Sequence, residues 1–265
     1  MSADDVAFLV RSPNRAAVLA ELTEAPATRA ELRERIGASR VTVGRITGDL
    51  VDRGWVTQTD GSYRATSAGR AVSGAYEQFR DTVETTRRLE PLLPYLPVER
   101  FDFELTALSD AELVVPDATD PSRHFTRLRE LFADAVEVTM VVHAVDPEIV
   151  AAQEAATRAG DHHTRGVVTT DLAAAMRADE AVRDRIASAV AAGGLALSER
   201  PSVPFQAAMF EDIVAISADD EAGVPRGIVC SDAPAVRTWL RAEFERLSAD
   251  ATPISADSFG ADADG

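Results

Sequence analysis

Residues 28–46 read Thr-Arg-Ala-Glu-Leu-Arg-Glu-Arg-Ile-Gly-Ala-Ser-Arg-Val-Thr-Val-Gly-Arg-Ile. Thr28, with Glu31 three residues later, is the pattern of a capping box, which begins a helix. Gly37 lies where the chain must turn, and Ser39 is a second N-cap that begins another helix. The stretch therefore predicts two helices joined by a tight turn.

The flanking sequence predicts the other elements of a winged helix. A helix is expected over residues 13–22, and the helix that begins at Ser39 is expected to end near residue 53. Two short strands, 55–58 and 62–65, flank Thr-Asp-Gly, which is typical of a hairpin turn. We interpret this hairpin as the wing and the long predicted helix after it, residues 66–90, as a connector or dimer helix.

Charge is distributed unevenly along the chain. Residues 1–70 carry ten arginines against nine acids, a net charge of +1, whereas the remaining 195 residues carry 17 arginines against 35 acids, a net charge of −18. An acidic chain that is nearly neutral only here is expected to present this surface to a polyanion.

The outer face of the predicted second helix carries residues suited to DNA. Arginine can bind guanine with two hydrogen bonds, and valine or threonine can contact the thymine methyl group. Helix N-termini and a wing arginine can hold phosphates, although both caps are needed for the fold in any case, and an ordinary solvated helical hairpin is the alternative interpretation. The predicted DNA-binding residues are Thr28, Ser39, Arg40, Val41, Thr42, Gly44, Arg45 and Arg64.

A proline-rich stretch, residues 91–97, separates this region from a second domain. Strands and helices alternate beyond it, which predicts an α/β domain with a parallel centre and an antiparallel C-terminal part. The fold class is thus an α+β winged helix followed by an α/β domain with a mixed sheet. Expected are strands 101–105, 111–115, 136–142, 166–169, 195–197, 207–210, 213–217 and 227–230, and helices 121–132, from 146, 171–192 and 234–247.

The sequence predicts three segments: residues 1–90 as the winged helix-turn-helix with its connector, 91–248 as a sensor or regulatory domain, and 249–265 as a disordered acidic tail. In open α/β sheets, ligands bind beyond the carboxyl ends of the strands. His143, Asp146, Thr169 and Thr170 follow two such strands and are the candidate effector-binding residues. Helix capping alone also explains Asp146 and Thr170.

Several functions are disfavoured by the sequence. The chain has no lysine, which excludes a Walker A lysine, a Schiff-base lysine and a phospholipase-type His-x-Lys site, and no hydrolase, metalloprotease or dinucleotide motif is present. No enzymatic activity, cofactor or metal is expected. His162-His163 is interpreted as part of a solvated loop, His124 as a surface or packing residue, and Cys230 as a small buried apolar residue.

No signal peptide or apolar run of membrane length is found, and one cysteine allows no internal disulfide, so a cytoplasmic protein is expected. All 27 basic residues are arginine, and the calculated pI is about 4.6. This composition is typical of halophilic archaea, in whose salty cytoplasm dense surface acids repel one another little.

The chain resembles known regulators over most of residues 10–248. Residues 39–46, 49–56 and 63–70 are similar to the winged helix of haloarchaeal transcription regulators, with Thr47 where such helices usually carry leucine. Residues 141–150, 167–172, 210–217 and the helix around Trp239 are similar to the sensor domain of the methanogenesis-regulator (FilR-type) family. The resemblance implies a sequence-specific repressor or activator, and it does not identify the effector.

We therefore expect a transcription regulator whose C-terminal domain senses an effector or mediates oligomerisation. Its expected partners are double-stranded DNA, a second copy of the chain and, if the domain is a sensor, a small-molecule effector, with no membrane. A homodimer would place two recognition helices in successive major grooves, and an effector would change their spacing through the helix 66–90. The alternative is a winged-helix adaptor that binds another protein of the transcription machinery and has no operator. A metabolic enzyme fused to a winged helix is a third, disfavoured possibility.

Overall fold

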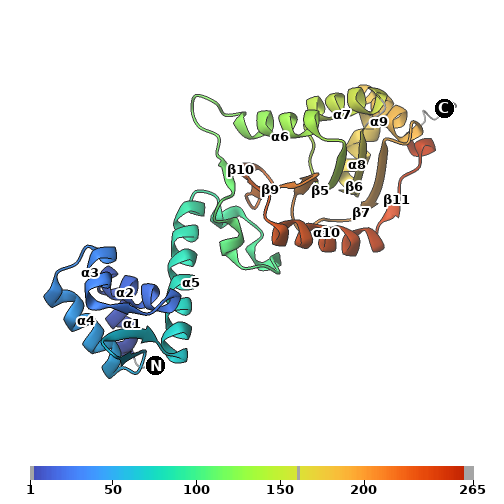
Figure 1. Ribbon diagram of the computed structural model, residues 1–265. Helices are drawn as coiled ribbons and strands as arrows, with labels where there is room; N and C mark the ends of the chain where they lie inside the picture. The colour runs from blue at the N-terminus through green and yellow to red at the C-terminus, as the bar shows by residue number, and fades with distance from the viewer. Residues whose placement is uncertain (1–2, 160–161, 260–265) are drawn as a thin grey trace. The chain divides into compact units, whose positions relative to one another are not determined.

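The computed structural model describes residues 3–159 and 162–259 (Figure 1). The chain divides into two units between Glu84 and Thr85, inside helix α5 and a few residues before the predicted boundary. Each unit has its own hydrophobic core.

The first unit is a winged helix, as predicted. Its three-stranded antiparallel sheet has the order β1-β3-β2. Helix α1 was not predicted, and it contributes Phe8 and Leu9 to the core. The elements are α1 (Ala3–Val10), α2 (Pro13–Glu24), β1 (Ala27–Thr28), α3 (Arg29–Ile36), α4 (Arg40–Asp52), β2 (Val56–Thr59), β3 (Ser62–Ala65) and α5 (Ser67–Leu89), which continues into the second unit.

Short-range hydrogen bonds fix the helix-turn-helix. The Thr28 hydroxyl accepts from the Glu31 backbone N–H at 3.3 Å, and the Glu31 carboxylate accepts from the Thr28 backbone N–H at 2.7 Å, so the predicted capping box is confirmed. The bonds that the Glu31 carboxylate accepts from the Thr28 backbone N–H and hydroxyl lower the pKa of Glu31. Gly37 adopts the left-handed conformation with φ 71°, and Ser39 accepts from the Thr42 N–H at 3.1 Å.

The wing is a hairpin with a two-residue turn. Asp60 and Gly61 have φ values of 49° and 77°, the left-handed pair that a tight hairpin turn requires. Thr57 then lies opposite Arg64 in the register of β2 and β3.

The second unit is a mixed eight-stranded sheet between two helical layers, which confirms the predicted fold class. The strand order is β11-β7-β6-β5-β8-β9-β10-β4; β7, β6 and β5 are parallel and the remaining neighbours antiparallel. The strands are β4 (Glu112–Val114), β5 (Glu137–Val142), β6 (His163–Thr169), β7 (Leu195–Arg200), β8 (Ala207–Phe210), β9 (Ile213–Asp219), β10 (Pro225–Ser231) and β11 (Thr252–Pro253).

Helices cover both faces of this sheet (Figure 1). One core cluster lies beneath α6 (Arg123–Asp134), α7 (Pro147–Ala159), α8 (Thr170–Ala178) and α9 (Glu180–Ala191). The other lies beneath α10 (Pro234–Ala249), together with the last turn of α5 and the 3-10 turns η1 (Leu93–Tyr95), η2 (Val98–Arg100) and η3 (Leu105–Leu108).

The predicted strand 101–105 is wrong. Phe101 and Phe103 stack with ring centroids 4.6 Å apart, and both meet Trp239 of α10 edge-on. The alternation of apolar residues therefore reflects burial of an irregular segment. In a run this short, a strand and an irregular buried segment can give the same pattern. Strand β4 pairs with β10 instead, with Val114 opposite Ile228.

The predicted helix 171–192 is two helices. Asp179 leaves the helical conformation with ψ 109°, and its carboxylate accepts from the Val182 N–H at 3.1 Å, so that it ends α8 and caps α9. An aspartate favours caps over helix interiors because its side chain competes for backbone N–H groups.

The expected disordered tail, residues 249–265, is wrong for residues 252–259. Strand β11 pairs with β7, and Ile254 and Phe259 are buried, Phe259 in the 3-10 turn η4 (Ala256–Phe259). Arg177 of α8 lies 5.5 Å from the Phe259 ring. Two apolar side chains thus anchor a segment whose composition alone predicts disorder, and residues 260–265 lie outside the described residues.

Candidate nucleic-acid interface

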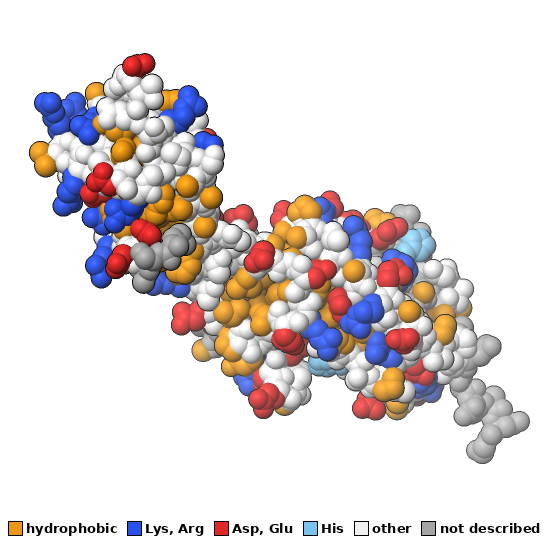
Figure 2. Space-filling view, turned by 90° about the horizontal axis from the view of Figure 1, so that it is seen from below, with side chains coloured by type: hydrophobic (Ala, Val, Ile, Leu, Met, Phe, Trp, Pro, Cys, Tyr) orange, Lys and Arg blue, Asp and Glu red, His pale blue; other side chains and the backbone are white. Residues whose placement is uncertain are grey.

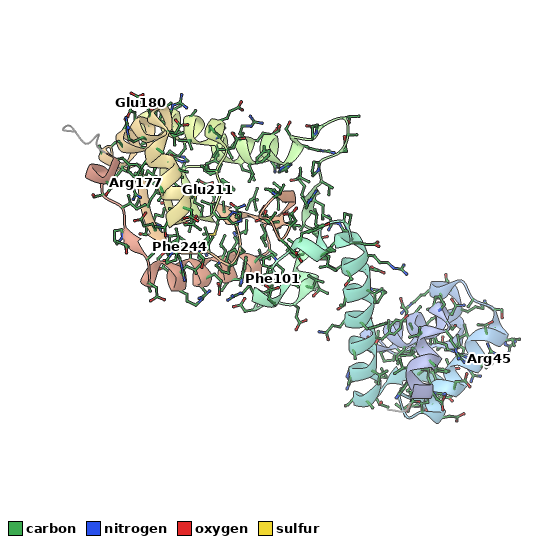
Figure 3. All side chains as sticks on the ribbon, turned by 180° about the vertical axis from the view of Figure 1, so that it is seen from behind. Arg45, Phe101, Arg177, Glu180, Glu211 and Phe244 are labelled. Carbon is green, nitrogen blue, oxygen red and sulfur yellow. The ribbon has the colours of Figure 1, made fainter. Side chains whose placement is uncertain are left out.

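Helix α4 has a buried face and an exposed face. Val43, Ile46, Thr47 and Leu50 are at most 1% exposed and face the unit's core. On the other side Val41 is 82% exposed, and Arg40 and Arg45 are also exposed. Neither arginine has a hydrogen-bond or ion-pair partner among the described residues, and Arg45 projects outward (Figure 3). These side chains are free to contact another molecule.

The two glycines of α4 leave the helix backbone uncovered. A Cβ atom added to Gly44 or Gly48 would meet no atom of the described chain within 4 Å. Packing inside this unit therefore does not require glycine at either position, although a glycine in a helix interior costs about 0.5–1 kcal/mol relative to alanine. What the glycines provide is close access to the α4 backbone from outside.

The capping hydroxyls serve the fold. The Thr28 hydroxyl lies 2.9 Å from the Glu31 carboxylate, and the Ser39 hydroxyl 2.9 Å from that of Thr42. Arg64 is exposed on the wing strand β3. Figure 2 shows arginine side chains (blue) over the winged-helix unit, in keeping with its nearly neutral net charge.

Thr47 takes part in contacts between α3, α4 and the wing that were not predicted from the sequence. It is fully buried; its hydroxyl donates to the Gly44 carbonyl at 3.1 Å and accepts from Arg29 Nε at 3.0 Å. The Arg29 guanidinium also lies 5.2 Å from the Tyr63 ring of β3. The threonine that departs from the usual leucine thus holds α3, α4 and, through Arg29, the wing together.

We expect Thr47→Val to destabilise the winged helix by about 0.5–1.5 kcal/mol, because the partly buried hydrogen bond from Arg29 Nε to the Thr47 hydroxyl is lost. Denaturant unfolding followed by circular dichroism measures this cost. In a double-mutant cycle with Arg29→Met, the two costs should not add, since both changes remove the same bond. Additive costs would show that the bond contributes nothing.

In the second unit, the candidate effector residues do not form one site. Asp146 accepts from the Glu148 N–H at 2.8 Å and Thr169 from the Leu172 N–H at 3.2 Å, so both act as helix caps. Thr170 is exposed at the first position of α8, so the expectation that it caps this helix is wrong. His143 and Asp146 line different cavities, whereas Thr169 and Thr170 line neither of them.

His143 belongs to a polar network at the end of β5. The Gln206 side-chain oxygen accepts from the backbone N–H groups of His143 and Ala144 at 3.2 and 3.0 Å. Asp219 accepts from Gln206 Nε2 at 3.2 Å and lies 3.3 Å from His143 Nε2. Sequence reasoning missed Gln206 and Asp219, because they come from distant parts of the chain.

Two of the cavities in the second unit are large enough to hold a small molecule. An open polar cavity of about 1140 Å³ is lined by residues 94–97, 99, 143, 203–205, 217, 219–223 and 226. A smaller and more enclosed cavity of about 350 Å³ lies between α6, the start of α7 and the sheet, and its lining is mostly apolar.

His162 and Cys230 serve the structure of the second unit. His162 is 2% exposed and bonds the Ala135 carbonyl and the Thr164 hydroxyl, so its expected place in a solvated loop is wrong. Burial, with the nearby Glu112 carboxylate, raises the pKa of the Cys230 thiol to about 12, which keeps it protonated. Within the described ranges, no cluster of three or more His, Cys, Asp or Glu side chains could hold a metal.

No helix in the described part of the chain is long and apolar enough to cross a membrane. Residues 3–88 match the HVO_A0261 N-terminal domain, and residues 121–250 match the middle domain of the methanogenesis regulatory protein FilR1. No curated protein matches the chain in sequence.

Many solved structures are similar to the chain at low identity, among them the following three. TrmBL2, an archaeal chromatin protein, is 13% identical over 96% of this chain and 100% of its own, with a TM-score of 0.44. The phospholipase D family member Nuc from Salmonella typhimurium is 11% identical over 55% and 99%, with a TM-score of 0.43. CalO1, a methyltransferase of calicheamicin biosynthesis, is 19% identical over 76% and 64%, with a TM-score of 0.24. Scores this low say nothing about function.

A winged helix followed by an α/β unit with a mixed sheet makes this a two-domain protein. The chain combines the HVO_A0261 N-terminal domain with the middle domain of the methanogenesis regulatory protein FilR1, and these domains identify it as a transcription regulator.

Proposed function

We propose that this regulator binds a specific sequence of double-stranded DNA through α4. The observation that carries the proposal is the outer face of that helix, where arginines without partners flank glycines that packing does not require. In the major groove, Arg40 and Arg45 reach guanine edges, and Val41 and Thr42 contact thymine methyl groups. Arg64 and the N-termini of α3 and α4, capped by Thr28 and Ser39, hold the phosphate backbone.

The salt concentration determines which of these contacts contribute to the affinity for DNA. The arginine-only, acidic composition fits a halophilic archaeon, and at about 1 M salt the Debye length is only about 3 Å. Affinity from counterion release is then largely lost. Specific binding must rest on the base contacts of α4, in a cytoplasm that holds molar salt.

Gly44→Ala is expected to stabilise the winged helix by about 0.5–1 kcal/mol and yet weaken DNA binding, because the new methyl group lies where the DNA approaches. Gly74→Ala is the matched control: Gly74 lies in α5, and a Cβ there also meets nothing in the described chain within 4 Å. The control should gain stability without losing affinity. Unchanged DNA binding by Gly44→Ala would remove the α4 backbone from the interface.

Helix α5 offers a surface for a second copy of the chain. Val72, Tyr76, Phe79 and Val83 follow one another at spacings of four, three and four residues, the pattern of a two-helix seam. The first two pack against the winged-helix core, whereas Phe79 is 58% and Val83 37% exposed. We place the dimer contact here, because it joins two recognition helices for half-sites about 34–36 Å apart.

Phe79→Glu is expected to convert the dimer to a monomer, because it places a charge in the seam. Sedimentation equilibrium at molar salt measures the change. Gln78→Glu adds the same charge one position away on an exposed residue and should leave the dimer intact. A dimeric Phe79→Glu protein would locate the interface elsewhere, the second unit being the next place to test.

Chromatin immunoprecipitation of the tagged protein from its own cells tests the function directly. Sharp peaks upstream of a few genes are expected, and those genes would indicate the class of effector. A flat profile from well-expressed protein would contradict the proposal and favour an adaptor, which a stable complex with another protein would then reveal.

A further inference from the structure

The smaller cavity, of about 350 Å³, arises from small residues in adjacent strands. Ala208 of β8 lies opposite Ala215 of β9, and Met140 of β5 lies opposite Ala208. Two neighbouring alanines leave a hollow in the sheet surface beneath α6. Phe125, Leu128 and Phe132 of α6 line the other side without filling it.

Protein interiors are close-packed, with few voids larger than a water molecule. A cavity of this size is within the range of small-molecule sites, roughly 300–1,000 Å³. Its edge reaches solvent, because Ala144 and Pro147 in the lining are exposed. A ligand could therefore enter beside the N-terminal end of α7.

One polar side chain in this lining has no partner. His124 is 4% exposed, and neither ring nitrogen has a hydrogen-bond partner within the described residues. Burial lowers its pKa, so the ring is neutral near pH 7 and offers one donor and one acceptor. Buried polar groups are rarely left unpaired, and a bound molecule with one hydrogen-bonding group would satisfy this one.

We propose that this cavity binds a neutral, largely apolar small molecule whose single polar group hydrogen-bonds to His124. Gln206 connects the site to its surroundings, since it lines the cavity while its side chain bonds to the backbone at the end of β5 and to Asp219. The inference rests on the proposed function in one respect only, namely that such a molecule would be the effector.

The test uses the full chain in molar KCl and two neutral probes, 2-naphthol, which has one hydroxyl group, and naphthalene, which has none. Calorimetric titration is expected to give one site per chain, with 2-naphthol bound roughly 2–12-fold more tightly, the ratio that one hydrogen bond provides. If neither probe binds saturably, the proposal is overturned.

Two variants locate the site. His124→Phe keeps a ring of similar size, and the affinity ratio of the two probes should fall to about one; His163→Phe, at an exposed histidine, should not change it. Ala215→Leu should abolish binding of both probes by filling the cavity, whereas Ala196→Leu, at an exposed position of β7, should not. Binding to Ala215→Leu at the wild-type affinity, or a ratio unaffected by His124→Phe, would overturn the assignment.

Operator binding by the same preparations separates the two proposals. A wild-type protein that binds operator but neither probe would refute only the cavity site. Probe binding by a protein without an operator would leave the cavity site in place and refute the DNA-binding function.

Discussion

Arg45→Ala is expected to lower the affinity for the operator by about 1–3 kcal/mol, roughly 5–150-fold, while binding to random duplex stays nearly unchanged. Arg45 is exposed, has no partner in the described chain, and lies on the face of α4 opposite to its buried residues. A bidentate contact with guanine carries sequence information that a phosphate contact does not. Competition between labelled operator and random duplex, in molar salt, measures the discrimination.

Arg45→Lys separates charge from geometry. Lysine keeps the positive charge but not the planar pair of donors, so discrimination should fall nearly as far as in the alanine variant. Arg183→Ala, at a half-buried arginine of the second unit that bonds Asp184, should change neither affinity. If Arg45→Ala discriminates as the wild type does, Arg45 does not read bases, and Arg40 becomes the candidate for that role.

The winged helix could be predicted because its signals are local. The capping box at Thr28, the turn at Gly37 and the hairpin at Asp60-Gly61 each involve residues within a few positions of one another. Hydrogen bonds at that range do not depend on the rest of the fold. The exposed face of α4 follows from the same helix boundaries.

The second unit was harder to predict because its contacts are long-range. Phe101 lies against Trp239 of α10. Strand β11 pairs with β7, although β8, β9, β10 and α10 lie between these two strands in the sequence. The composition of residues 249–265 indicates solvation, whereas burial of Ile254 and Phe259 in the core anchors residues 252–259. Nothing within a sequence window distinguishes such partners.

The same reason explains what was missed in the sites. Thr47 was noted only as a departure from leucine, since its partner Arg29 is 18 residues away. His124 was expected at the surface or in packing, and it is buried, but its position beside a cavity depends on two alanines in β8 and β9. The presence of an alanine in a strand does not indicate from the sequence that a cavity lies beside it.

Trp239→Ala is expected to destabilise the second unit by about 3–5 kcal/mol, a large share of the 5–15 kcal/mol typical of a domain. Trp239 is 1% exposed, and its indole N–H donates to the Arg100 carbonyl at 2.8 Å. Its ring lies 5.1 Å from that of Phe101 and 5.0 Å from that of Phe205. The substitution therefore opens a cavity and also leaves a carbonyl without its donor.

Fluorescence can separate the two units in this experiment. The chain has two tryptophans, so in the variant all indole emission comes from Trp55 of the winged helix. Circular dichroism should show unfolding of the second unit at lower denaturant while Trp55 emission keeps its wild-type midpoint. Trp239→Phe retains an aromatic ring but not the N–H, and should cost about 1–3 kcal/mol. If Trp239→Ala and Trp239→Phe lower the free energy of unfolding equally, the stabilisation comes from the hydrogen bond. If the denaturant midpoint of Trp55 emission also shifts, the two units unfold together.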